Sequence, residues 1–266
     1  MAREAWLALI VFVLLCASAG LGRYVRPRLP EDHRRRETVE AMQLMIGMLV
    51  TFTALVLGLL TASVKTAYDE AGHDLQEYAL QLTQLDQCMR NYGPDTEPAR
   101  AILADYTWTV IATTWTSEAP PAGTHRPEPS GIRRVGPSPA LANQLNQIYL
   151  SLRHLQPADS FQAGVREDCI IVYNNVMAIR RSAIEDDRSP ISVPLYLILV
   201  FWLTVIFVSI GLVAPRNALS LVGIALGAIS LSLAIFVISG LSHPYFVAFS
   251  SADMRAAFAA MTAAGS

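Results

Sequence analysis

Four long runs of the chain carry no charged side chain, and they dominate its pattern of hydrophobic and polar positions. The runs cover residues 5–22, 41–64, 190–215 and 217–242. A helix needs about 20 mostly apolar residues to cross the hydrocarbon core of a bilayer. The runs therefore predict four transmembrane helices, and we expect the third to begin near Pro194 because proline is tolerated only at the start of a helix.

The first run could also be a cleaved signal peptide, because Ala17, Ser18 and Ala19 have the small-x-small form of a cleavage site. Its leader, Met-Ala-Arg-Glu, has no net positive charge, and the apolar run extends to Leu21. Both features favour a membrane helix over a signal peptide.

The second run continues into a polar segment that keeps one apolar seam. Neighbouring members of the seam are three or four residues apart, the heptad spacing of a coiled coil: Tyr68, Ala71, Leu75, Tyr78, Leu82, Leu85, Met89 and Tyr92. No Gly-Pro pair interrupts the two parts. We predict one continuous helix over residues 41–92 that crosses the membrane and then joins an extramembrane helical bundle.

Three more amphipathic helices are predicted between the second and third runs. Thr96 can cap the first, Pro139 can begin the second, and Asp159 or Ser160 can open the third. Residues 117–137, with five prolines and three glycines, predict a loop. Beyond the fourth run, Met254, Phe258 and Met261 share one face of a short helix that we expect at the membrane interface.

The predicted fold class is therefore all-α, a polytopic membrane protein with four transmembrane helices and an inserted extramembrane bundle. Four segments follow from this reading. Residues 1–64 hold transmembrane helices 1 and 2 and an Arg-rich loop. Residues 65–190 form the bundle, residues 191–242 hold transmembrane helices 3 and 4, and residues 243–266 form a tail.

The arginines predict how the chain is oriented. Six of them crowd the connection after the first run, and Arg216 lies in the short turn after the third. The six are Arg23, Arg26, Arg28, Arg34, Arg35 and Arg36. The positive-inside rule makes this side of the membrane cytoplasmic, so both termini and the bundle are expected outside. The arginines could also hold anionic lipid headgroups, although a topology signal is the simpler interpretation.

Two cysteines are predicted to lie level with each other in the bundle. Cys88 follows Lys65 by 23 residues, and Cys169 precedes Pro190 by 21 residues. At about 1.5 Å of rise per residue, two antiparallel helices would carry these thiols at the same height. We favour a disulfide between them over two inert thiols, since an extracytoplasmic compartment permits the bond.

Two stripes of small residues are predicted on membrane helices. The second helix carries Gly47, Thr51, Ala54, Gly58 and Thr61, and the fourth carries Gly223, Gly227 and Ser230. Small residues allow close packing of helices in lipid, which is the interpretation we favour. The alternative is a narrow pore that the hydroxyls of Thr51 and Thr61 line.

The sequence offers no catalytic constellation. The four spans carry no charged residue, which argues against a proton-coupled transporter. No nucleophile motif, phosphate-binding loop or metal-binding motif is present. We therefore expect no enzyme activity, no catalytic, cofactor-binding or metal-binding residue, no cofactor and no nucleic-acid partner.

Several stretches resemble the bacterial bestrophin-like proteins, a domain family of unknown function. The resemblance lies in residues 55–69, in Leu85-Asp86, in Tyr92-Gly93-Pro94, in Ala99-Arg100 and in Trp115. It returns in residues 200–204, in the turn from Gly211 to Ala218, which is its most specific part, and in Pro244-Tyr245-Phe246. The family often has Pro-Phe-x-Gly at the last of these.

The resemblance implies a bacterial cytoplasmic (inner) membrane protein and, through the bestrophins, an oligomeric anion channel with four membrane helices per subunit. The lipid bilayer and further copies of the chain are then its expected partners. The alternative function is a structural or signalling membrane protein whose extracytoplasmic bundle binds another envelope protein. The heptad seam and the acidic character of residues 65–190 motivate that alternative.

Overall fold

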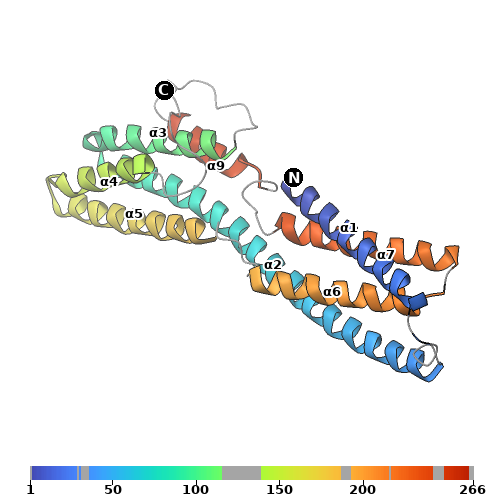
Figure 1. Cartoon of the computed structure of the whole chain (residues 1–266). Coiled ribbons are helices and arrows are strands. Elements are labelled where there is room, and N and C mark those ends of the chain that lie inside the picture. Colours follow the sequence, from blue (N-terminus) through green and yellow to red (C-terminus); the bar gives the residue numbers. More distant parts are fainter. Residues whose placement is uncertain are drawn as a thin grey trace. The chain divides into compact units, whose positions relative to one another are not determined.

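The computed structural model of the chain describes residues 2–28, 30, 36–115, 139–186, 193–215, 217–241 and 249–263. These residues form helices and short connections without any strand, so the predicted all-α class is confirmed (Figure 1). The helices are α1 (Ala2–Val25), α2 (Arg36–Tyr92), α3 (Glu97–Thr114), α4 (Pro139–His154), α5 (Ser160–Asp186), α6 (Val193–Val213), α7 (Ala218–Leu241) and α9 (Ala252–Ala263). By length and composition, α1, α2, α6 and α7 are the four that could cross a membrane.

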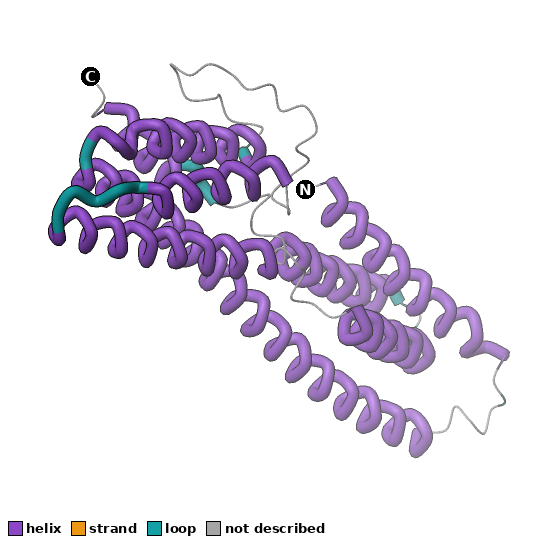
Figure 2. Tube along the Cα trace, turned by 90° about the vertical axis from the view of Figure 1, so that its left-hand side faces the viewer, coloured by secondary structure: helices purple, strands orange, loops and turns teal. Residues whose placement is uncertain are grey.

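The chain divides into two compact units. Unit 1 comprises Met1–Tyr68 and Ser189–His243, and unit 2 comprises Asp69–Arg188 and Pro244–Ser266. Helix α2 is common to both, because its 57 residues run without a break from Arg36 to Tyr92 (Figure 2). The helix predicted over residues 41–92 therefore begins earlier, at Arg36.

In unit 1, helix α1 packs against α6 and α7. The hydrophobic core of this unit draws on all four candidate spans: Val11, Leu15, Ala19, Leu60, Val64, Leu199, Leu203, Ile206, Phe207, Ala228, Ile235 and Ile238. Such packing takes the place of the hydrophobic effect between helices in lipid, since lipid tails are as apolar as the side chains.

Two glycines allow the backbones of α1 and α6 to touch. A Cβ on Gly211 would lie 2.2 Å from the carbonyl oxygen of Ala19, and a Cβ on Gly22 would lie 2.2 Å from that of Val208. No side chain could be accommodated at either distance. The crossing therefore depends on glycine at both positions.

In unit 2, the predicted seam of α2 forms the centre of the core. Ala71, Tyr78, Leu82, Leu85, Met89 and Tyr92 are buried, while Tyr68 and Leu75 are partly buried. Helix α4, one of the predicted amphipathic helices, contributes Leu141, Leu145, Ile148 and Leu152 to this core, each three or four residues from the next. The heptad pattern thus identified the buried face of α2 correctly.

The connections in unit 2 show why its helices begin and end where they do. Gly93 follows α2 with a positive φ of 124°, a conformation that side chains with a Cβ rarely adopt. Thr96 lies at the N-cap position of α3, but its hydroxyl donates to the carbonyls of Met89 and Gly93 rather than capping the helix. Asp159 does cap α5, because its carboxylate accepts a hydrogen bond of 2.7 Å from the backbone N–H of Gln162.

The C-terminal helix corrects one expectation. Met254, Phe258 and Met261 do share one face of α9, but they are buried in the core of unit 2 instead of lying at a membrane interface. The indole N–H of Trp115 also donates to the carbonyl of Phe249, just before α9, at 2.7 Å. An apolar stripe on a short helix can face either a membrane interface or a protein core, and in this structure it faces the core of unit 2. The predicted loop at residues 117–137 and the motif Pro244-Tyr245-Phe246 lie outside the described residues.

We expect Gly211→Ala to lower the stability of the protein by about 1–3 kcal/mol, because the added methyl group would force α1 and α6 apart. Thermal unfolding in detergent measures the loss. Gly223→Ala is the matched control, since a Cβ at Gly223 meets nothing within 4 Å. Equal unfolding temperatures for the two variants would show that the glycine crossing contributes nothing.

Candidate functional site

The stripe of small residues on α2 is uncovered. We call Gly47, Thr51, Ala54, Gly58 and Thr61 the α2 stripe; all five lie in unit 1 and are exposed. A Cβ added at Gly47 or Gly58 would meet nothing within 4 Å. The most apolar window of α2 is 11% buried, compared with 22–28% for the other three candidate spans. The single chain therefore leaves this face of α2 open.

A different face of α2 makes the contacts within unit 1. Thr53, Leu60 and Val64 are buried there, whereas the α2 stripe lies about a third of a turn away on a helix of 3.6 residues per turn. The hydroxyl of Thr53 has no hydrogen-bond partner. One side of α2 is thus committed to the fold, and the stripe is available for another contact.

The hydroxyl groups of the stripe are satisfied by their own helix. Thr51 donates to the carbonyl of Gly47 at 2.9 Å, and Thr61 donates to that of Leu57 at 2.7 Å. A hydroxyl can rotate, so each could instead donate to an anion beside the helix while its oxygen remains an acceptor. The stripe thus offers uncharged donors on an open helix face.

The second stripe, on α7, is partly packed within the chain and partly exposed. At Gly227 a Cβ would lie 3.9 Å from the ring of Phe207, so this residue packs against α6 within the chain. Gly223 and Ser230 are exposed, and a Cβ at Gly223 would meet nothing within 4 Å. The structure therefore assigns a packing role within the chain to Gly227 only.

A disulfide joins Cys88 on α2 to Cys169 on α5 in unit 2. Their Cα atoms are 5.5 Å apart and the two residues are separated by 81 positions in the sequence. Closing a loop of this length is worth about 4 kcal/mol of stability in the chain-entropy model. Cys16 on α1 is a free cysteine. The bond fixes α5 to the helix that also passes through unit 1.

A buried ion pair attaches α9 to α2 and α3. Asp86 is 4% exposed and accepts hydrogen bonds from Arg90 at 2.7 Å and from Arg100 at 2.9 Å. Arg90 also donates to the carbonyls of Ala260 and Met261, at 3.0 and 2.9 Å. A cation at this point satisfies the free carbonyls that end α9.

The sequence analysis did not assign this ion pair, although two signals for it were present. Asp86 and Arg90 are four residues apart, so they share a helix face. Leu85-Asp86 and Ala99-Arg100 are also among the stretches that carry the family resemblance. The contact of Arg90 with α9 joins residues far apart in the sequence, so no local sequence pattern predicts it.

Two buried tyrosines provide a polar contact within the core of unit 2. The hydroxyls of Tyr78 on α2 and Tyr106 on α3 are hydrogen-bonded to each other. Burial raises the pKa of Tyr78 well above its usual value, and it raises the pKa of Tyr106 as well. Both side chains therefore remain neutral at physiological pH. Neither can serve as a base there, and the pair instead fixes how α2 and α3 meet.

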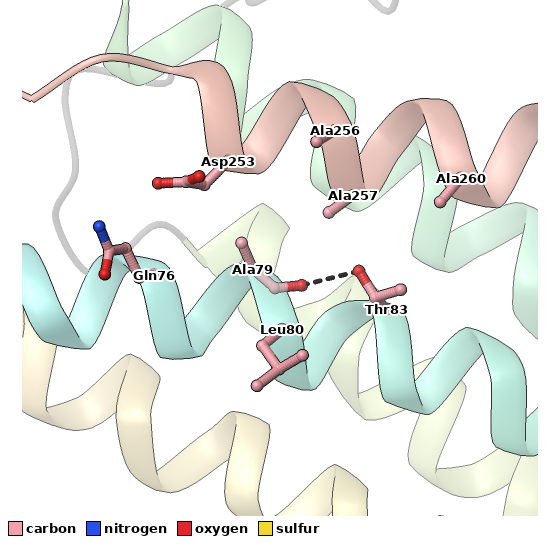
Figure 3. A pocket seen from close by; sticks show the side chains of 8 residues that line it. All are labelled: Gln76, Ala79, Leu80, Thr83, Asp253, Ala256, Ala257 and Ala260. Atoms are coloured by element: carbon pink, nitrogen blue, oxygen red, sulfur yellow. Dashed lines mark hydrogen bonds between the residues drawn. The ribbon is translucent and has the colours of Figure 1, made fainter.

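A groove of about 570 Å³ lies between α2 and α9 in unit 2 (Figure 3). Its lining is mostly small, and Thr83 uses its hydroxyl on the carbonyl of Ala79 at 2.9 Å. The lining residues are Gln76, Ala79, Leu80, Thr83, Asp253, Ala256, Ala257 and Ala260. They combine neither a nucleophile with a base nor a set of metal ligands. Among the described residues, no three His, Cys, Asp or Glu side chains gather as a metal site requires.

The comparisons with known proteins give one match. A family model described as a Bestrophin-like domain matches residues 12–250. This range includes most of the first candidate span, the other three spans, both bonded cysteines, Asp86 and Arg100. No curated protein and no solved structure matches the chain. The match confirms the resemblance drawn from the Gly211–Ala218 turn and the other stretches.

Proposed function

This chain belongs to the Bestrophin-like family, and from that membership we propose that it assembles into an oligomeric anion channel whose conduction path is lined by α2. The chain is a membrane protein of that family. Bestrophins, after which the family is named, are oligomeric anion channels. We expect the protein to have no enzyme activity.

The exposure of the α2 stripe carries this proposal. A helix face directed at lipid is usually built from large apolar side chains, and small residues are enriched where helices or subunits meet. The stripe has the composition of an interface, but the described residues of the chain provide no neighbour for Gly47 or Gly58. Further copies of the chain, arranged around an axis, would place this face against a neighbour or beside a shared path.

The chemistry of the stripe suits weak binding of a mobile anion. Conduction requires groups that replace part of the hydration of the ion without holding it. The hydroxyls of Thr51 and Thr61 are donors of this kind, and residues 41–64 carry no charged side chain that would trap a counter-ion. The absence of a charged residue in the spans also favours a passive path over proton-coupled transport.

For orientation, we propose that unit 2 and both termini are extracytoplasmic in a bacterial inner membrane. Arg23, Arg26 and Arg28 directly follow the first span, which supports a cytoplasmic position for this connection. The disulfide between Cys88 and Cys169 supports an oxidising compartment for unit 2.

Purified protein in liposomes should conduct halide in preference to potassium or sodium, and Thr51→Leu should reduce halide flux roughly three- to tenfold. One hydrogen bond contributes about 0.5–1.5 kcal/mol, which corresponds to this range of rates. Ion flux from loaded liposomes is the measurement. Met48→Leu, on an exposed position of α2 outside the stripe, is the control and should leave flux unchanged. Absence of halide flux in the intact protein would reject the channel, and normal flux in Thr51→Leu would reject the role of the stripe.

The orientation has a separate test on intact cells. A membrane-impermeant thiol reagent should label Cys88 and Cys169 after mild reduction and leave them unlabelled before it, because the disulfide blocks both thiols. Peptide mapping identifies the labelled cysteines, and a double Cys88→Ser, Cys169→Ser variant should take up no label in unit 2. Labelling only after the cells are permeabilised would place unit 2 in the cytoplasm.

A further inference from the structure

The end of α1 and the short helix that follows it carry three arginines close together in the sequence. Arg23 lies in the last turn of α1, and Arg26 and Arg28 form the ends of the 3₁₀ helix η1 (Arg26–Arg28). No acidic residue occurs between Ala5 and Arg28. These arginines directly follow the most apolar part of α1, and this position corresponds to the depth of lipid headgroups beside a membrane-spanning helix.

One of these arginines is fixed to a neighbouring helix. Arg26 donates a hydrogen bond to the carbonyl of Ala214, just beyond the end of α6. The same end of α1 touches α6 at Gly22 and Gly211, where the backbones meet. The short helix η1 therefore keeps a defined place in unit 1, and its arginines are held together.

Arg28, the second arginine of η1, is exposed and lies over an aromatic ring. Its guanidinium carbon is 3.6 Å from the ring centre of Tyr24, and its Nη1 donates to the carbonyl of Tyr24 at 2.9 Å. Tyr24 is itself 62% exposed. These contacts use one N–H of the five that a guanidinium carries, and the ring orients the rest.

Three other arginines of the described chain are neutralised by carboxylates. Arg36 pairs with Glu40 at 2.8 Å, and Arg90 and Arg100 pair with Asp86. Among the described residues, no carboxylate forms an ion pair with Arg26 or Arg28. Neither Arg26 nor Arg28 is therefore neutralised by an ion pair within the described part of the protein.

We propose that Arg26 and Arg28, with the ring of Tyr24, form a docking surface for the phosphate of an anionic phospholipid headgroup. A phosphate diester accepts hydrogen bonds from two guanidinium groups at once, and Arg matches its geometry. The lipid chains would lie along the exposed apolar side of α1, where Leu21 is 54% exposed. The bound lipid would strengthen the attachment of α1 to the end of α6 that Arg26 already makes.

Binding of lipid to the full chain in a neutral detergent tests this surface. Native mass spectrometry would count bound molecules during titration with phosphatidylglycerol and, separately, with phosphatidylcholine of the same acyl chains. We expect tighter binding of phosphatidylglycerol, and about fivefold weaker binding of it by Arg28→Gln, the equivalent of about 1 kcal/mol for one arginine at the surface. Arg153→Gln is the matched control, because Arg153 lies over the ring of Tyr149 in unit 2 and is also exposed.

Three results would overturn the proposal: equal affinity for the two lipids, the same affinity in Arg28→Gln as in Arg153→Gln, or equally tight binding of inorganic phosphate, which would mean that the lipid is not the ligand. If Arg28→Gln does not fold, the salt dependence of lipid binding by the wild-type protein still tests the proposal. Its preference for phosphatidylglycerol should fall as salt is raised, since the attraction is electrostatic, and a preference that is independent of salt would contradict the role of the arginines.

Discussion

A helix in hydrocarbon must satisfy all of its backbone polar groups within itself, and this constraint explains the central helix of the protein. Helix α2 meets this requirement, because it runs from Arg36 to Tyr92 without a break. Its N-terminal part therefore has a rigid backbone suited to an apolar medium, and its C-terminal part provides the seam of unit 2. The other features of unit 2 depend on that seam: the disulfide to α5, the tyrosine pair with α3, and the ion pair that attaches α9.

The disulfide and the buried ion pair hold the helices of unit 2 in different ways. The disulfide restricts the unfolded chain, whereas the pairing of Asp86 with Arg90 and Arg100 is local and buried. Removing one member of such a pair leaves an uncompensated charge, which is costly even where the pair itself adds little. The ion pair is therefore better understood as fixing the place of α9 than as a source of net stability.

Sequence periodicity was enough to predict the parts of the fold that depend on one helix at a time. The uncharged runs predicted the four spans, and three- and four-residue spacings predicted the buried face of α2. Periodicity could not predict contacts between segments that are distant in the sequence. Met254, Phe258 and Met261 have the same spacing on an interfacial helix as in a core, and Gly22 gives no sign of its contact with Val208. For the candidate site, the sequence identified the α2 stripe, and only the structure showed that the stripe is left exposed by the described residues.

Two surfaces of unit 1 remain open in the structure, and they have different chemistry. The α2 stripe is small and uncharged, which suits another copy of the chain or a narrow path. The arginine group at the end of α1 is cationic and suits lipid phosphate. The two proposed sites share no residue, so each can be tested by substitutions that leave the other unchanged.

The most direct measurement of the central claim is the water accessibility of α2 in the assembled protein. Single cysteines placed at successive positions from Leu44 to Thr61, in a Cys16→Ser background, would be exposed to a hydrophilic thiol reagent in liposomes. If α2 lines the path, the rate of modification should be high at Gly47, Thr51, Ala54, Gly58 and Thr61 and low at Met48, Phe52 and Leu55. Uniformly low rates, or a maximum on the Met48 face, would contradict the account.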